Sequence, residues 1–318
     1  MLLSLFPPIA AYAAWLAICE ACLLWNMHQT YRRAGGGLRG AVLSSVWLCF
    51  SPLFLEFWVG QFTFFLGTLL FYATLALEEG HWQSAQRLWL LSVLWKPASL
   101  LWAPIWLHNR RFWRGLAAAG LLLVVDQATY FALVPGDWQL FSGTNFQSTP
   151  TWHAGNIGLS ALIYQFTGNS PTYTWMRWMC TAVLLVPLLL LTVRPIRPER
   201  AALEYRLRAS LWTLLYFLLY KDVWEHHLTL LLPFLILALL RAPSPLLWIL
   251  TLSFLLPSPF VLYDLPRLGV NVDPQPYWSF GASVVQHAWR VVPLVILYGT
   301  WLYEAFRTRP ELRSIPVS

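Results

Sequence analysis

Long runs of hydrophobic residues, separated by short polar segments, repeat from one end of the chain to the other. The runs near 7–27, 41–57, 62–77, 115–134, 174–193, 209–224, 227–240, 246–262 and 284–305 are typical of membrane-crossing helices. We therefore predict an all-α integral membrane protein, a polytopic helical bundle with about nine full crossings. No segment is polar enough for a separate soluble domain, so residues 1–318 are interpreted as a single multipass transmembrane domain.

One further hydrophobic run, at 85–107, does not fit this pattern because Lys96-Pro97 lies at its centre. A full crossing there would also put Arg110, Arg111 and Arg114 on the side opposite to most of the other arginines. Two short helices, 88–95 and 98–107, avoid both problems, since non-helical backbone is tolerated at membrane depth where it lines a cavity. The sequence thus predicts a re-entrant helical hairpin with Lys96 at its tip.

The charged residues of the loops predict an orientation. With this topology, 16 of the 21 lysines and arginines lie on one side, which the positive-inside rule identifies as cytoplasmic. They are Arg32, Arg33, Arg39, Arg87, Arg110, Arg111, Arg114, Arg194, Arg197, Arg200, Arg206, Arg208, Arg241, Arg307, Arg309 and Arg313. The net charge of +7 then reflects topology and not nucleic-acid binding. Long loops at 135–156 and 264–283 indicate a functional outer face of the plasma membrane, with the C-terminus cytoplasmic.

The densest group of ionisable residues is the segment from Lys221 to His227. Only 11% of the chain is charged, and ionisable groups at membrane depth mark functional sites. Carboxylates beside imidazoles can remove a proton from a hydroxyl. The catalytic candidates are therefore Asp222, Glu225, His226 and His227.

Two features of this segment limit the interpretation. Lys221 and Asp222 have an alternative role, in which they neutralise each other at a helix end. His226 and His227 are adjacent, so on a helix their side chains diverge by roughly 100° and form a poor chelating pair. We predict no metal and no cofactor.

Other polar residues are expected at the same outer face, and these are the substrate-binding candidates. They are Gln61, Lys96, His153, Asn156, Lys221, Arg267 and Arg290. Lysine can neutralise a phosphate as a point charge and arginine can bind it bidentately. For His153 and Asn156, an alternative is a helix cap before the amphipathic stretch at 157–166. Together these residues predict a site for a phosphorylated lipid and an acceptor.

Six short motifs follow one another along the chain. They are Phe6-Pro7-Pro8-Ile9-Ala10, Gly60-Gln61-Phe62, Lys96-Pro97, Arg110-Arg111-Phe112-Trp113, Gly155-Asn156-Ile157-Gly158 and Trp224-Glu225-His226-His227. In this order they resemble glycosyltransferase family 87. The resemblance implies the GT-C membrane fold and a polyprenyl-phosphate sugar donor, commonly carrying mannose. It also implies that the Gly-Gln segment, the Lys-Pro tip and the Trp-x-His-His helix start surround the donor and the acceptor.

The expected function is inverting transfer of a hexose, with mannose as the expected sugar, to a hydroxyl of a lipid-linked or cell-envelope glycan. A carboxylate or His227 takes the acceptor's proton, and Lys96 with Lys221 or an arginine stabilises the leaving phosphate. The expected partners are this donor, this acceptor and membrane lipids.

The resemblance also implies a difference at the N-terminus. Family members carry a further helix and a first outer loop, with the acidic residue thought to act as general base, before the segment that Phe6-Pro7-Pro8 matches. The chain is therefore expected to be N-terminally incomplete relative to the family. This leaves a non-catalytic polyprenyl-phosphate binder or flippase-like protein as the alternative.

Overall fold

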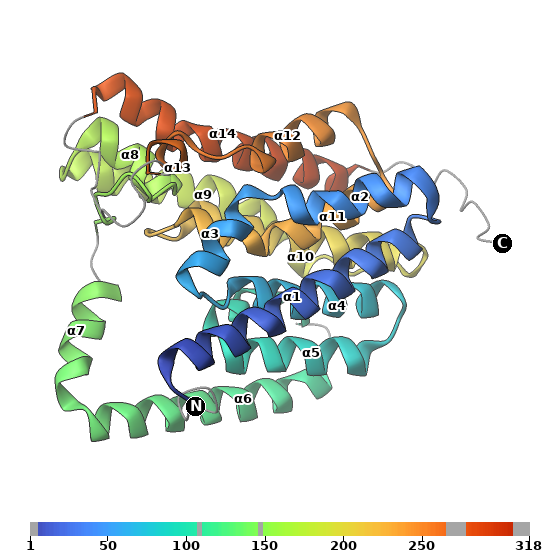
Figure 1. The fold of residues 1–318 in the computed structure, drawn as a ribbon. Coiled ribbons are helices and arrows are strands. Elements are labelled where there is room, and N and C mark those ends of the chain that lie inside the picture. The colour runs from blue at the N-terminus through green and yellow to red at the C-terminus, as the bar shows by residue number, and fades with distance from the viewer. Residues whose placement is uncertain (1–5, 107–109, 146–148, 265–277, 308–318) are drawn as a thin grey trace.

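The computed structural model describes residues 6–106, 110–145, 149–264 and 278–307, and these residues form helices joined by short connections (Figure 1). The elements are α1 (Pro8–Arg33), α2 (Gly37–Cys49), α3 (Ser51–Val59), α4 (Thr63–Glu78), α5 (Trp82–Trp95), η2 (Pro97–Trp106), α6 (Arg110–Leu133), α7 (Pro135–Asn145), α8 (Leu159–Thr167), α9 (Pro171–Val193), η3 (Pro198–Arg200), α10 (Ala201–Leu219), η4 (Glu225–Leu230), α11 (Leu232–Arg241), α12 (Pro245–Leu255), α13 (Pro259–Asp264) and α14 (Phe280–Phe306). The predicted all-α class is confirmed for these residues.

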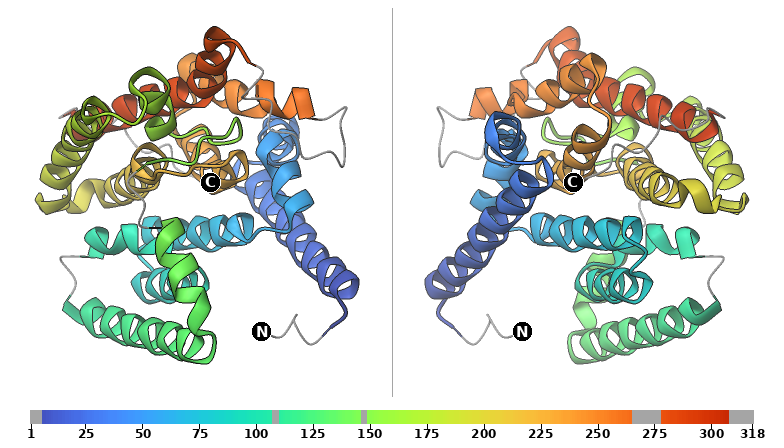
Figure 2. Two further views of the ribbon diagram at one scale, coloured as in Figure 1. Left: turned by 90° about the vertical axis from the view of Figure 1, so that its left-hand side faces the viewer. Right: turned by 90° about the vertical axis from the view of Figure 1, so that its right-hand side faces the viewer.

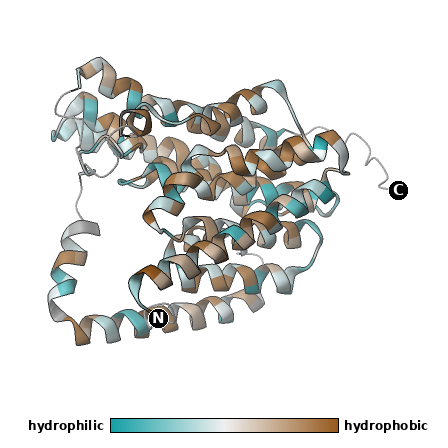
Figure 3. Cartoon of the chain, viewed as in Figure 1, coloured by the Kyte–Doolittle hydropathy of each residue, from teal (hydrophilic) through white to brown (hydrophobic). Residues whose placement is uncertain are grey.

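Membrane-length apolar helices occur throughout the fold. Among the described residues, five helices are long and apolar enough to cross a bilayer, namely Pro8–Arg33, Phe112–Leu133, Pro171–Val193, Pro245–Leu262 and Phe280–Phe306. The bent pair α2 and α3 makes a sixth if it is counted as one span. The chain is thus a multi-pass membrane protein, although the predicted nine full crossings are not shown. Hydrophobic residues extend along most of each long helix (Figure 3).

The core lies in the middle layer of the molecule. α10, α4 and α11 are buried along most of their length, between α12 and α14 on one side and α5 and α6 on the other (Figures 1 and 2). The candidate spans are mostly exposed, and only 6% of the span in α6 is buried. Their apolar outer surfaces are suited to lipid, while the buried helices position the polar residues described below.

The predicted hairpin is confirmed as two short helices that meet at Lys96. Proline disfavours helical backbone in the residue before it, and Lys96 is extended at φ −149° and ψ 117°. The two arms pack together, with the Trp89 indole N–H donating to the Ser99 carbonyl at 2.9 Å. The second arm is a 3₁₀-helix. Whether the hairpin is re-entrant in a bilayer stays a prediction.

Three segments differ from the predicted helices. The run 209–224 stops being helical after Leu219, and 227–240 begins as the 3₁₀-helix η4 before α11. Phe50 is extended and divides the run 41–57 into α2 and α3, with Pro52 in the first turn of α3. The predicted loop 135–156 contains the helix α7. Hydrophobicity alone does not locate the breaks after Leu219 and at Phe50, because the apolar runs continue through both positions.

Candidate functional site

The connection between α10 and η4 is held in place by one buried amide side chain, that of Asn156. Its Oδ1 accepts a hydrogen bond from the Val223 N–H at 3.1 Å, and its Nδ2 donates to the carbonyls of Lys221 and Thr151, each at 3.1 Å. The Ile157 N–H also donates to the Val223 carbonyl at 2.7 Å. Buried backbone outside a helix needs such partners. Asn156, a predicted substrate-binding residue, therefore has an amide that positions the chain.

Lys221 and Asp222 form a buried ion pair, with Nζ 3.1 Å from Oδ2. The other carboxylate oxygen of Asp222 accepts from the Thr151 N–H at 2.7 Å and from Asn156 Nδ2 at 3.2 Å. This is the arrangement in which the two charges neutralise each other. Asp222 was predicted to be catalytic, but both of its oxygens are occupied by contacts within the fold.

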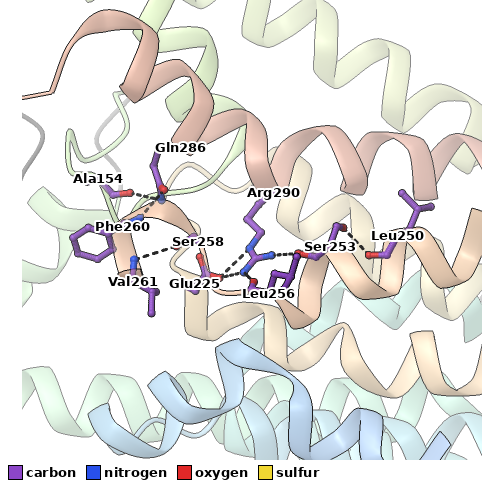
Figure 4. Close-up of polar contacts among 10 residues, drawn as sticks. All are labelled: Ala154, Glu225, Leu250, Ser253, Leu256, Ser258, Phe260, Val261, Gln286 and Arg290. Carbon is purple, nitrogen blue, oxygen red and sulfur yellow. Dashed lines mark hydrogen bonds and ion pairs between the residues drawn. The ribbon is translucent and has the colours of Figure 1, made fainter. Parts of the chain in front are cut away.

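Glu225 and Arg290 form a second buried ion pair, between η4 and α14 (Figure 4). Arg290 Nε donates to Glu225 Oε1 at 2.9 Å, and Nη2 donates both to the same oxygen and to the Leu256 carbonyl. Nη1 donates to the Ser253 carbonyl. Arg290 is fully buried and each of its nitrogens has a partner. Its hydrogen bonds connect α14 to the end of α12 and to the segment that carries the two histidines.

Gln286, one turn before Arg290 on α14, adds to these connections (Figure 4). Its Nε2 donates to the Ala154 carbonyl at 3.0 Å, and its Oε1 accepts from the Phe260 N–H at 2.9 Å. The loop before Asn156 and the start of α13 are thereby bound to the same helix. Neither Gln286 nor the Glu225–Arg290 pairing was predicted, because such contacts link residues far apart in sequence.

His226 and His227 lie in the first turn of η4 and differ in their hydrogen bonding. His227 Nδ1 accepts from the Trp224 N–H at 3.3 Å, so in the neutral ring the proton is on Nε2. The ring nitrogens of His226 have no hydrogen-bond partner among the described residues, and this ring is partly exposed. The ring centroids are 4.5 Å apart at an interplanar angle of 72°, so the two rings are in edge contact.

Both imidazoles are neutral near pH 7. Burial, with a smaller contribution from the charge of Lys96, lowers the pKa of His226 to about 4. Burial, then His226 and Lys96, lower the pKa of His227 well below its ordinary value. His226 therefore offers a free lone pair and His227 offers an N–H donor.

Lys96 and Glu56 complete this group. Burial lowers the pKa of Lys96, and the nearby Glu56 carboxylate opposes that shift. Glu56 is fully buried in α3, which packs against η4. Its Oε1 accepts from the Phe64 N–H at 2.9 Å, while Oε2 has no hydrogen-bond partner among the described residues. Glu56 was given no role among the predicted catalytic and substrate-binding residues. An ionisable residue inside an apolar run, close to Gly60-Gln61, is nevertheless a sequence signal of a functional site.

The remaining predicted residues lie around this group or outside the described chain. The Gln61 side chain is partly exposed, and its carbonyl accepts from the Trp15 indole at 3.1 Å. His153 Nδ1 accepts from the Gly155 N–H at 2.9 Å, and its ring lies 5.3 Å from that of Trp224. Arg267 lies outside the described residues. Within the described chain, no three His, Cys, Asp or Glu residues lie close enough to hold a metal.

Comparison with known proteins identifies the family. The family model for glycosyltransferase family 87 matches residues 1–220. The chain belongs to glycosyltransferase family 87. No curated protein matches the chain. The family 87 match includes Glu56, Gln61, Lys96, His153 and Asn156. It ends before the segment with the two histidines, and Asn156, inside the matched region, forms hydrogen bonds with Lys221 and Val223 just beyond it.

We predict that Arg290→Ala strongly destabilises this family 87 protein. Removing one partner of a buried ion pair leaves an uncompensated charge, which costs about 3–5 kcal/mol. The free energy of unfolding, measured by denaturant titration in detergent micelles, checks this. Arg33→Ala is the control, because its pair with Glu79 is partly exposed and contributes at most about 1 kcal/mol. Wild-type stability of Arg290→Ala would contradict the structural role of the pair.

Proposed function

We propose that this glycosyltransferase moves a hexose, with mannose as the sugar, from a polyprenyl phosphate to a hydroxyl of a lipid-linked or cell-envelope glycan. The supporting observation is the group formed by Lys96, Glu56, His226 and His227. It combines a cation for a phosphate, a free imidazole lone pair and an N–H donor. The apolar surroundings suit a donor with a lipid chain.

In the proposed step, the acceptor oxygen attacks C1 of the sugar and the bond from C1 to the phosphate oxygen breaks. The polyprenyl phosphate leaves with an additional negative charge, and the sugar is inverted at C1. Lys96 stabilises that charge, and Nε2–H of His227 donates to a phosphate oxygen. Lys221 and Gln61 are proposed as further contacts of the donor.

The proton of the acceptor hydroxyl requires a base. Asp222 and Glu225 are each engaged in a buried ion pair, so we propose them as residues that position the segment. His226 has an uncommitted lone pair and takes the proton in this account. The charge that develops on His226 then lies near the departing phosphate, which accepts the proton as the products separate.

The arginines support a proposed orientation in the membrane. Five arginines form ion pairs near one end of the bundle, at the ends of α1, α9 and α11 and in the first half of α10. They are Arg33, Arg194, Arg206, Arg208 and Arg241. The histidine group follows the C-terminal end of α10, which is the end opposite to Arg206 and Arg208. We propose that the arginine-rich end faces the cytoplasm and the histidine group faces outward from the plasma membrane.

A second candidate function is binding of a polyprenyl phosphate without transfer. It is favoured by one observation, the engagement of both Asp222 and Glu225 in contacts within the fold. Lys96 would then bind the phosphate and no proton would be removed. Wild-type protein that retains the labelled lipid and transfers no sugar would favour this candidate over the transferase.

We predict that His226→Ala reduces sugar transfer by about 100-fold or more, because it removes the general base. Transfer from radiolabelled polyprenyl-phosphate mannose in proteoliposomes measures the effect. His28→Ala, an exposed histidine on α1, is the control and keeps full activity. Transfer at the wild-type rate by His226→Ala, with normal folding, would exclude His226 as the base.

The pH profile gives a separate prediction. Because the pKa of His226 is lowered to about 4, its neutral form persists from pH 7 down to about that value. The acid limb of kcat/KM, which reports the free enzyme, is therefore expected near pH 4 and not near the ordinary histidine pKa of 6.5. An acid limb at pH 6.5 or above would contradict the buried environment of His226.

A further inference from the structure

Arg206 on α10 is a buried cation with most of its donors unused. Its side chain is 9% exposed, and Nη1 donates to Glu78 Oε1 at 3.3 Å. A guanidinium has five N–H donors, and Nε and Nη2 form no hydrogen bond with the described residues; neither atom is fully buried, so both are accessible from the space beside them.

A pocket of about 60 Å³ lies beside this guanidinium, between α10, α11, α12 and α14. Its polar lining includes Arg206, Glu304, Ser210 and Thr300. A buried water needs roughly 10–15 Å³ of such space, so the pocket can hold a group larger than one water. It lies at the arginine-rich end, away from the histidine group.

The charges around the pocket balance one another. Glu78 accepts from both Arg206 and Arg241, at 3.3 and 2.9 Å. Glu304 also acts electrostatically on Arg206, yet among the described residues it forms no ion pair with it. Two cations and two carboxylates sum to zero. A ligand that carries one positive and one negative group preserves this balance, whereas an anion does not.

The apolar part of the pocket lining is mostly buried and reaches the surface at Leu246. Leu246 and Leu247 on α12 and Leu297 and Trp301 on α14 line it, and Leu246 is 44% exposed. Both helices belong to candidate membrane spans. A headgroup in the pocket would therefore have its acyl chains beside the bilayer-facing surfaces of these helices.

We propose that this pocket binds a phospholipid whose headgroup carries a phosphate and a primary ammonium, such as phosphatidylethanolamine. The phosphate accepts from the unused N–H groups of Arg206, and the ammonium donates to the Glu304 carboxylate. A choline headgroup has no N–H to donate, and a glycerol headgroup has no cation, so both bind less well.

Native mass spectrometry of the full-length protein tests this directly. The delipidated protein is mixed with equal amounts of phosphatidylethanolamine, phosphatidylcholine and phosphatidylglycerol that have identical acyl chains. We expect about fivefold more bound phosphatidylethanolamine than either of the other two lipids. This ratio corresponds to a difference of about 1 kcal/mol in binding free energy. Excess soluble phosphoethanolamine does not displace it, because the acyl chains contribute to binding.

Variants separate the two contacts. Glu304→Gln removes the preference for ethanolamine lipid and leaves the Arg206–Glu78 pair in place, while Arg206→Gln lowers occupancy by all three lipids. Glu199→Gln, which changes an exposed carboxylate in η3, is the matched control and leaves binding unchanged.

Equal binding of the three lipids by the wild type, or preference for phosphatidylglycerol, would overturn the proposal. So would an unchanged preference in Glu304→Gln. The readout requires no sugar transfer, so its outcome is independent of the proposed function.

Discussion

Residues 220–224 leave helical geometry inside an apolar bundle, so their backbone polar groups need partners that a helix would have supplied. The Asn156 side chain meets this requirement for Lys221 and Val223, and the Ile157 N–H adds a backbone contact. Because η4 begins immediately after this connection, the position of both histidines depends on it. The geometry of the candidate site therefore depends on a residue that forms no hydrogen bond with either imidazole among the described residues.

The Glu225–Arg290 pair constrains the same segment from the other side. Buried ion pairs contribute little net stability compared with apolar contacts, but they require one arrangement of their partners. Here the pair and Gln286 bind η4, the Asn156 loop and α13 to α14. Both oxygens of Asp222 and one oxygen of Glu225 thus make contacts within the fold. Glu56 and Glu225 each keep one carboxylate oxygen without a hydrogen-bond partner among the described residues. We propose that Lys96 and the two imidazoles, beside these oxygens, are the groups available for chemistry.

Sequence patterns predict much of this fold. The runs at 174–193 and 284–305 agree closely with α9 and α14, and the Lys96-Pro97 break follows from the missing proline N–H and its steric effect. The end of α10 at Leu219 could not be predicted, because the apolar run continues beyond it. The pairing of Glu225 with Arg290 joins residues 65 positions apart, which no local pattern reports.

The sequence predicted which residue types gather at the candidate site better than it predicted how they are arranged. Lys96 and the two histidines were predicted from charge and spacing. The different hydrogen bonding of His226 and His227 depends on a 3₁₀ turn that brings the Trp224 N–H to His227 Nδ1. Glu56 was given no predicted catalytic or binding role, because a single glutamate in an apolar helix does not reveal its contact with the start of α4.

Hydrogen exchange of the Asn156→Ala variant tests the central claim most directly. The account predicts that the amides of segments 149–158 and 220–227 exchange faster together, by about tenfold or more, while those of α10 keep their wild-type protection. Unchanged exchange in 220–227 would contradict the claim that Asn156 holds the histidine segment in place. So would equal loss of protection throughout α10.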